Sequence, residues 1–164
     1  MEKRISETEI LWAKCREDAI VPTRDLGNAG YDIYANFDGD ALQLPAHKTV
    51  LVPTGIACGL NDKYYFQVEE RGSTGSKGLK KSAGVIDASY RGEIFIAITN
   101  ANDTDWSIVK DYTGEENTYP YTKAIAQLVL HEVPVMDSRI VSLAELQNDY
   151  ATDRGSGALG SSGK

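Results

Sequence analysis

Short runs of apolar and β-branched residues, separated by turn-forming residues, constrain the fold of this chain more than any other feature. Several runs alternate with a period of two, as in residues 93–98, which is the spacing of a half-buried strand. The runs are rich in Val, Ile, Tyr and Thr, which favour strands. They cover residues 9–13, 31–35, 49–60, 64–68, 93–100, 124–133 and 139–143. This pattern predicts an all-β sandwich, jelly roll or barrel, with helix possible only in the first dozen residues and at 143–148.

Composition bounds the class of protein. A chain of 164 residues is one domain's worth and buries roughly two-thirds of its surface on folding. The net charge of −7 argues against binding to a nucleic-acid polymer. With only Cys15, Cys58, His47 and His131 available, neither a disulfide framework nor a zinc cluster is expected. We find no apolar run typical of a signal peptide and no stretch near the roughly 20 apolar residues of a membrane span. We therefore expect a cytoplasmic protein that does not bind membranes.

Two segments differ from the strand pattern. Residues 101–122 are polar and acidic with scattered aromatics, and we expect a long hairpin or excursion between two strands of a β-domain at 1–150. Residues 151–164 are nearly all Gly, Ser and Thr around one arginine, a composition that predicts a mobile C-terminal arm. Such a tail is commonly a linker or an expression scar, but an arginine among spaced glycines also suits an anion.

Two segments place polar groups where they could meet a charged ligand. Asp32 lies within an aromatic strand segment, where it either faces solvent or serves a cation. Residues 70–78 contain Arg71 followed by small and hydroxyl residues, which either form a plain turn or contact phosphate oxygens. The spacing is not that of a Walker A loop.

The segment 83–93 carries the sharpest signal. Asp87 follows an apolar pair and precedes a turn, so it either caps that turn or takes a proton from water. Tyr90 offers a flat face to a sugar or a base. Gln127, alone among apolar residues at 124–130, either pairs with the backbone or points at a ligand.

In order and combination, these segments closely resemble the five motifs of the homotrimeric dUTP pyrophosphatase (dUTPase) family. The matching segments are AGYDIYA, RGSTG, GVIDASYRGE, IAQLV and RGSGALGSSG. The third and fifth are individually specific, and the resemblance runs from about Pro22 to Lys164. It implies a jelly-roll β-barrel, a homotrimer with shared active sites, and Mg²⁺-dependent hydrolysis of dUTP to dUMP and pyrophosphate.

The resemblance also implies roles for single residues. Asp87 would orient and deprotonate the water that attacks the α-phosphorus. Tyr90 would pack against the deoxyribose and exclude a 2′-hydroxyl, and Asp32 would reach the metal through water. Arg154, on the arm, would close over the γ-phosphate. The other implied substrate-binding residues are Arg71, Gly72, Ser73, Ser82, Gly84, Val85, Gln127, Gly157, Leu159, Gly160 and Ser161.

The chain departs from the family pattern at five of its positions. Gly72 stands where a serine normally contacts the phosphates, and Lys81 where many members carry an asparagine near the uracil. Ala124 replaces the common arginine before IAQ. In the tail, Leu159 stands where an aromatic stacks on uracil and Ala158 where a glycine is usual. Loss of that stacking ring would cost roughly 1–3 kcal/mol of binding free energy.

Two other functions compete with dUTP hydrolysis. The related dCTP deaminases share the barrel, but they carry a catalytic glutamate where this chain has Ala97 and an arginine where it has Ser76. Alternatively, the chain is a weakly catalytic or regulatory member of the family that binds a protein through residues 101–122. The aromatic residues of that candidate surface are Trp106, Tyr112, Tyr119 and Tyr121.

Overall fold

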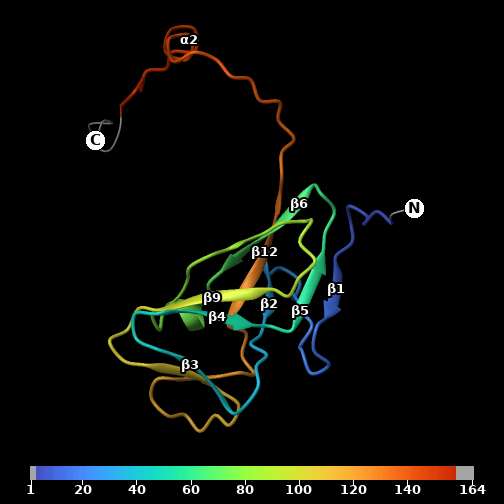
Figure 1. The fold of residues 1–164 in the computed structure, drawn as a ribbon, viewed down its shortest axis with the longest axis vertical. Coiled ribbons are helices and arrows are strands. Elements are labelled where there is room, and N and C mark those ends of the chain that lie inside the picture. Colours follow the sequence, from blue (N-terminus) through green and yellow to red (C-terminus); the bar gives the residue numbers. More distant parts are fainter. Residues whose placement is uncertain (1–2, 158–164) are drawn as a thin grey trace. The chain divides into compact units, whose positions relative to one another are not determined.

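The period-two runs form strands in the structure, a computed structural model that describes residues 3–157 (Figure 1). The fold is all-β and jelly-roll-like, as predicted. The strands are β1 (Leu11–Lys14), β2 (Gly30–Ile33), β3 (Ala41–Leu44), β4 (Thr49–Pro53), β5 (Ile56–Gly59), β6 (Tyr64–Glu69), β7 (Leu79–Lys81), β8 (Val85–Ile86), β9 (Phe95–Asn100), β10 (Trp106–Val109), β11 (Thr118–Pro120) and β12 (Ala126–Glu132). The helices are α1 (Gly72–Gly75) and α2 (Leu143–Asn148).

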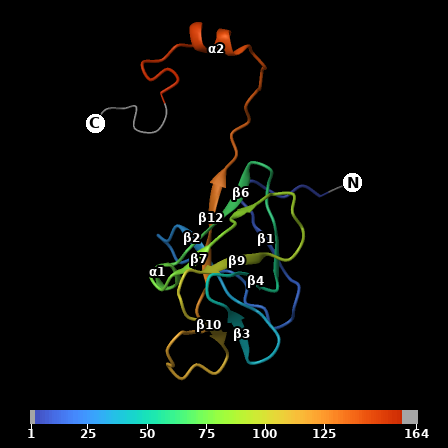
Figure 2. The same cartoon turned by 60° about the vertical axis from the view of Figure 1, so that its left-hand side comes forward.

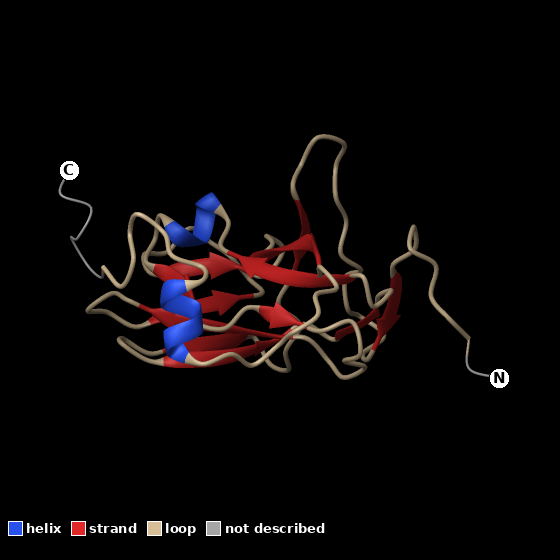
Figure 3. Ribbon diagram, turned by 90° about the horizontal axis from the view of Figure 1, so that it is seen from above, coloured by secondary structure: helices blue, strands red, loops and turns tan. Residues whose placement is uncertain are grey.

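Strand β12 occupies the middle of the sheet that carries most of the candidate residues. This four-stranded sheet has the order β2-β12-β6-β8, and three of its strands, β2, β12 and β6, are labelled in Figures 1 and 2. Both neighbours pair antiparallel with β12, so that Gln127 lies between Asp32 on β2 and Glu69 on β6. The other sheets are β4-β9-β7, β11-β10-β3 and β1-β5. Figure 3 shows the strands in red, stacked in layers.

The core lies between these sheets. Ile33, Phe66 and Ile96 are fully buried. Ile33 on β2 and Phe66 on β6 belong to the four-stranded sheet, and Ile96 on β9 belongs to the sheet β4-β9-β7. The ring of Trp12 stacks on Phe66 with 5.6 Å between ring centroids, which ties β1 to the core. Burial of each such side chain contributes about 1.5–3 kcal/mol to the free energy of folding.

The structure differs from the sequence predictions in the first dozen residues and at 139–143. The described part of the first dozen residues, 3–12, contains no helix. The strand expected from the run at 9–13 is present as β1, which pairs antiparallel with β5. The run 139–143, described throughout, forms no strand because no other strand lies beside it to pair with its backbone. The helix expected at 143–148 is present as α2.

The excursion at 101–122 differs from a simple hairpin. Its two strands, β10 and β11, run parallel to each other, and β10 also pairs antiparallel with β3. Ile108 and Tyr119 belong to the hydrophobic core. Of the two alternatives, the segment is thus an excursion between β9 and β12 and not a simple hairpin, and part of it completes a sheet and buries two large side chains.

The chain divides into two compact units, Met1–Val133 and Pro134–Lys164. The boundary lies earlier than the expected end of the β-domain at residue 150. Within the second unit, the Ser142 hydroxyl caps α2 by accepting a hydrogen bond from Glu145 N at 3.0 Å. Among its described residues, 134–157, none is buried. Across the part of the chain that the structure describes, no helix is long and apolar enough to span a bilayer.

Candidate active site

Asp87 lies directly after β8, at the start of a tight turn. The turn is closed by a hydrogen bond from Tyr90 N to Asp87 O at 3.1 Å. The carboxylate is exposed, and it opens onto a pocket of about 260 Å³. The pocket is lined by Val85, Ile86, Asp87, Tyr90, Glu93, Ile94 and Phe95. The structure thus brings together two of the residues singled out in the sequence, a carboxylate and an aromatic ring, at one small cavity.

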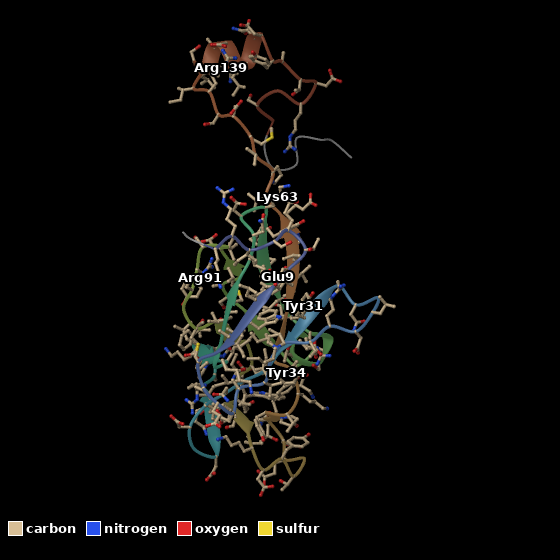
Figure 4. The ribbon with its side chains drawn as sticks, turned by 90° about the vertical axis from the view of Figure 1, so that its right-hand side faces the viewer. Glu9, Tyr31, Tyr34, Lys63, Arg91 and Arg139 are labelled. Carbon is tan, nitrogen blue, oxygen red and sulfur yellow. The ribbon has the colours of Figure 1, made fainter. Side chains whose placement is uncertain are left out.

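Tyr90 is held across its own turn. Its hydroxyl donates to Glu93 O at 2.8 Å, and its ring covers Gly92 so closely that a Cβ at Gly92 would lie 2.5 Å from the Tyr90 hydroxyl oxygen. Arg91, labelled in Figure 4, donates to Tyr90 O at 2.9 Å. A glycine after Tyr90-Arg91 is therefore required for the ring to lie in this position.

Gly84 anchors the hairpin that precedes Asp87. Its carbonyl accepts a hydrogen bond from Val68 N at 2.7 Å. A Cβ at Gly84 would lie 2.5 Å from Gln67 Nε2, the tip of a flexible side chain, and 3.2 Å from Val68 O, so any larger residue would push Gln67 aside and crowd the Val68 carbonyl. On the far side of the hairpin, Ser82 N donates to Ala97 O at 2.9 Å. These bonds leave Asp87 on a backbone held from both sides.

Arg71 and Asp32 form a half-buried ion pair beside α1, with 3.1 Å between Arg71 Nε and Asp32 Oδ1. The segment 72–75, expected as a turn or phosphate loop, is a single helical turn. Thr74 explains it, because its buried hydroxyl accepts from Arg71 N at 3.3 Å and donates to Arg71 O at 3.1 Å. Gly72 is exposed on this turn.

Gln127 reaches across to the same place. Its Nε2 donates to Glu70 O at 2.9 Å. Its Oε1 lies so close to Gly30 that a Cβ on that residue would be only 2.7 Å from it. Glu70 Oε1 in turn accepts from Lys81 N at 3.2 Å. Glu70 therefore links Gln127 to the hairpin of Asp87, a connection that no sequence signal at Glu70 indicated.

Tyr119 is the second residue that the sequence reasoning missed as part of this region. Its hydroxyl oxygen lies 3.0 Å from Ser73 Oγ, and the hydroxyl donates to Ala124 O at 2.8 Å. Burial raises the pKa of the Tyr119 phenol, while the Ser73 hydrogen bond and the charge of Arg71 act in the opposite direction. The side chain expected on a partner surface instead lies beneath the Arg71 turn.

Comparison with known proteins agrees with this geometry. A sequence model of the dUTPase family matches residues 16–163. The chain belongs to the dUTPase family. It is 38% identical to the deoxyuridine 5'-triphosphate nucleotidohydrolase of Candida albicans over 88% of this chain and 81% of that one. For the enzyme of the same name from Desulfotalea psychrophila, the identity is 34% over 99% of each chain.

Solved dUTPases share the fold of this family member. The dUTPase of Staphylococcus bacteriophage 80alpha with dUPNHPP superposes with a TM-score of 0.73 at 22% identity, over 96% of this chain and 99% of that one. A mutant dUTPase from phage phi11 of S. aureus, with a structural Mg(II) ion, gives a TM-score of 0.67 at 20% identity, over 84% and 99% of the two chains.

The described residues of this dUTPase fit a metal only if the metal arrives with its own ligands. Residues 3–157 contain no group of three or more His, Cys, Asp or Glu side chains that could hold an ion. A Mg²⁺ ion bound through phosphates needs only one or two protein carboxylates and retains several waters. Asp32, paired with Arg71, is a carboxylate that would suit such an ion.

The arm residues belong to the second unit. Arg154 Nε donates to Gly157 O at 3.0 Å, and Gly157 N donates to Arg154 O at 3.1 Å. Leu159, Gly160 and Ser161, expected to contact substrate, lie outside the described residues, as does Ala158.

Proposed function

We propose that this chain hydrolyses dUTP to dUMP and pyrophosphate, with Asp87 as the base for the attacking water. The observation that carries the proposal is the pocket shared by Asp87 and Tyr90 in a chain of the dUTPase family. An exposed carboxylate on an anchored turn can accept a proton from a water aligned with the α-phosphorus. The proton then stays on Asp87, which becomes a neutral carboxylic acid on a hairpin held from both sides, while the hydroxide oxygen bonds to phosphorus.

Selection of the deoxynucleoside falls to Tyr90 and the hairpin backbone. The Tyr90 ring, pinned over Gly92, forms a wall of the pocket, and a 2′-hydroxyl on the sugar would clash with such a wall. Free backbone groups between Ser82 and Asp87 would read the uracil edge, with Val85 at the pocket surface. A site that pairs with a base edge rejects a wrong base strongly, because its own polar groups are then left unpaired.

Two side chains keep donors available for the phosphates. Arg71 uses Nε for Asp32, which leaves the other guanidinium N–H groups for phosphate oxygens. The Gln127 amide carries two hydrogens and spends one on Glu70 O. Ser73 lies on the same turn. Gly72 has no side chain to contribute, so the hydroxyl contact passes to Ser73.

Mg²⁺ would be carried by the triphosphate, with Asp32 reaching it through water. When bound, the ion neutralises phosphate charge. The chain's own residues position the phosphates and hold the base, which is the main contribution to catalysis of this kind.

The arm would complete the site in a homotrimer. Arg154 would contact the γ-phosphate, and the backbone N–H groups of Gly157, Gly160 and Ser161 would add donors, with Leu159 over the uracil. An arm that orders only on a triphosphate would tie closure to the correct substrate. Cys15 and Cys58 form no disulfide, which suits a reducing compartment such as the cytoplasm.

The direct test incubates the purified protein with dUTP, UTP or dCTP and Mg²⁺, and measures pyrophosphate and ammonia. We expect pyrophosphate from dUTP alone. No release from dUTP, or ammonia from dCTP, would refute the proposal. Light scattering should give the mass of a trimer, and a monomer would refute the shared site.

A further inference from the structure

Three polar groups form a hydrogen-bond chain beneath the Arg71 turn: Ser73 Oγ, Tyr119 Oη and Ala124 O. Tyr119 has a single hydroxyl proton, and its 2.8 Å bond to Ala124 O uses it. The 3.0 Å contact between Ser73 and Tyr119 therefore requires Ser73 to be the donor. In this arrangement Ser73 presents only lone pairs to any other group.

Lone pairs cannot bind a phosphate oxygen, which is itself an acceptor. To contact a phosphate, Ser73 must turn its proton away from Tyr119. The Ser73 oxygen can still stay in contact with Tyr119 if the Tyr119 hydroxyl rotates to donate to it. Tyr119 is 2% exposed, so no bulk water takes its place. Burial raises the phenol pKa, so the proton needed for this reversal is retained at neutral pH.

We propose that Tyr119 is a positioning residue that holds Ser73 in both the free and the nucleotide-bound enzyme by reversing the direction of this hydrogen-bond chain. In the free state the order of donation is Ser73 to Tyr119 to Ala124 O. In the bound state it is Tyr119 to Ser73 to phosphate. The inference rests on the proposed function, because it takes Ser73 as a phosphate ligand.

The reversal exchanges one neutral hydrogen bond for a stronger one. Ala124 O loses its bond from Tyr119, while Ser73 gains a charge-assisted bond to phosphate. A donor that itself accepts a hydrogen bond is polarised and donates more strongly. A hydroxyl can hold Ser73 in both states because it is donor and acceptor alike, whereas a phenylalanine ring would fill the same space and do neither.

The location of Tyr119 gives the segment 101–122 a role in the site. Tyr119 lies on β11, within that segment, and its ring belongs to the barrel core. The segment therefore supports the phosphate side from below, through one hydroxyl.

The test compares four proteins, wild type, Tyr119→Phe, Ser73→Ala and the double variant, by calorimetric binding of a non-hydrolysable dUTP analogue and by steady-state kinetics. Loss of one hydrogen bond predicts that Tyr119→Phe raises Kd and KM about threefold to tenfold, with kcat within about twofold. The double variant should bind no more weakly than Ser73→Ala. Tyr121→Phe, which removes a nearby hydroxyl, should match wild type.

Two results would overturn the inference while the proposed function stands: active wild type with unchanged binding in Tyr119→Phe, or losses that add in the double variant. Inactive wild type would instead refute the proposed function. Thermal unfolding checks that each variant folds. If Tyr119→Phe does not fold, Ser73→Ala decides alone, because unchanged analogue binding there removes Ser73 from the site and the inference with it.

Discussion

The barrel unit, Met1–Val133, and the second unit, Pro134–Lys164, differ in how far their described apolar side chains are buried. In the barrel, Ile33, Phe66 and Ile96 are fully buried. In the second unit, Val135 is 94% exposed and Ile140 fully exposed. The described residues of this unit, 134–157, bury no side chain and so have no core to order them, and α2, at six residues, is shorter than helices that are stable alone. The barrel therefore supplies fixed geometry, whereas residues 134–157 have no packed core of their own to fix theirs.

The same contrast separates the proposed roles. Asp87 lies on a hairpin bonded to β6 and β9, where small displacements would cost rate. Within residues 3–157, Arg154 bonds only to the neighbouring Gly157. Chemistry is thus assigned to the unit that is packed and closure to the unit that is not.

The largest expected effect is that of Asp87→Asn. An amide cannot take a proton from water, so turnover should fall by about 10³-fold while analogue binding stays within a few-fold of wild type. Single-turnover kinetics and calorimetry measure the two quantities. Retained turnover would move the base elsewhere and break the assignment of chemistry to the barrel.

Deleting residues 152–164 should come next. Removing Arg154 and the backbone donors of the arm should lower kcat/KM by about 10²-fold, with the barrel's melting temperature and the trimer mass unchanged. A lower melting temperature or a lost trimer would show that the arm is structural. The matched control is Arg139→Ala, a charge removed from the same unit before α2.

Gly84→Ala tests the packing of the barrel hairpin. The added Cβ would lie 2.5 Å from Gln67 Nε2 and 3.2 Å from a backbone oxygen, and overpacking of this kind costs about 1–3 kcal/mol of stability. We expect a lower denaturation midpoint and reduced activity. Gly39→Ala separates overpacking from backbone strain. No atom lies near its added Cβ, so any loss of stability there comes from the φ of 78°, which disfavours alanine. Equal stability of Gly84→Ala and wild type would show that the hairpin can shift.

Alkaline pH should weaken the barrel. Burial raises the pKa of Cys58 and of Tyr119 above their ordinary values of 9.0 and 10.0. The unfolded chain therefore loses these protons first, and the stability that the neutral groups contribute is lost as pH rises from about 9. Urea midpoints across this range measure the slope, which should be shallower in Cys58→Ala and Tyr119→Phe than in wild type.

Ser142→Ala should have the smallest effect on the whole molecule. It removes the hydroxyl that caps α2, worth about 1 kcal/mol to that helix. The barrel's unfolding transition should not move. A coupled drop in melting temperature would mean that the two units unfold together.

Sequence alone predicts the barrel strands well because period-two burial is written into residues such as 93–98. Sequence prediction is less certain where pairing with a distant strand decides the structure. Residues 139–143 have strand composition but no neighbouring strand. The run at 9–13, for which the sequence allowed both strand and helix, is strand at Leu11–Lys14 because β5 pairs with it. The turn at 72–75 is helical through the single hydroxyl of Thr74, in a Gly-Ser-Thr-Gly segment of poor helix propensity.

The candidate site shows the same limit. Asp87 and Tyr90 lie three residues apart, so their shared pocket follows from one local turn. Glu70 and Tyr119 contribute through contacts with residues 11 and 46 positions away in the chain, which only the folded sheets create. Their residue types carry no local pattern that marks such a role.

The parallel pairing of β10 and β11 also makes the loop between them an attachment point for a sensor. Residues 111–116 are exposed, and both flanking strands are fixed by the sheet. In the variant Glu116→Cys, an environment-sensitive dye attached to the new thiol would lie two residues before β11, the strand that carries Tyr119. Nucleotide occupancy could then be followed as a change in emission, with no label in the pocket itself.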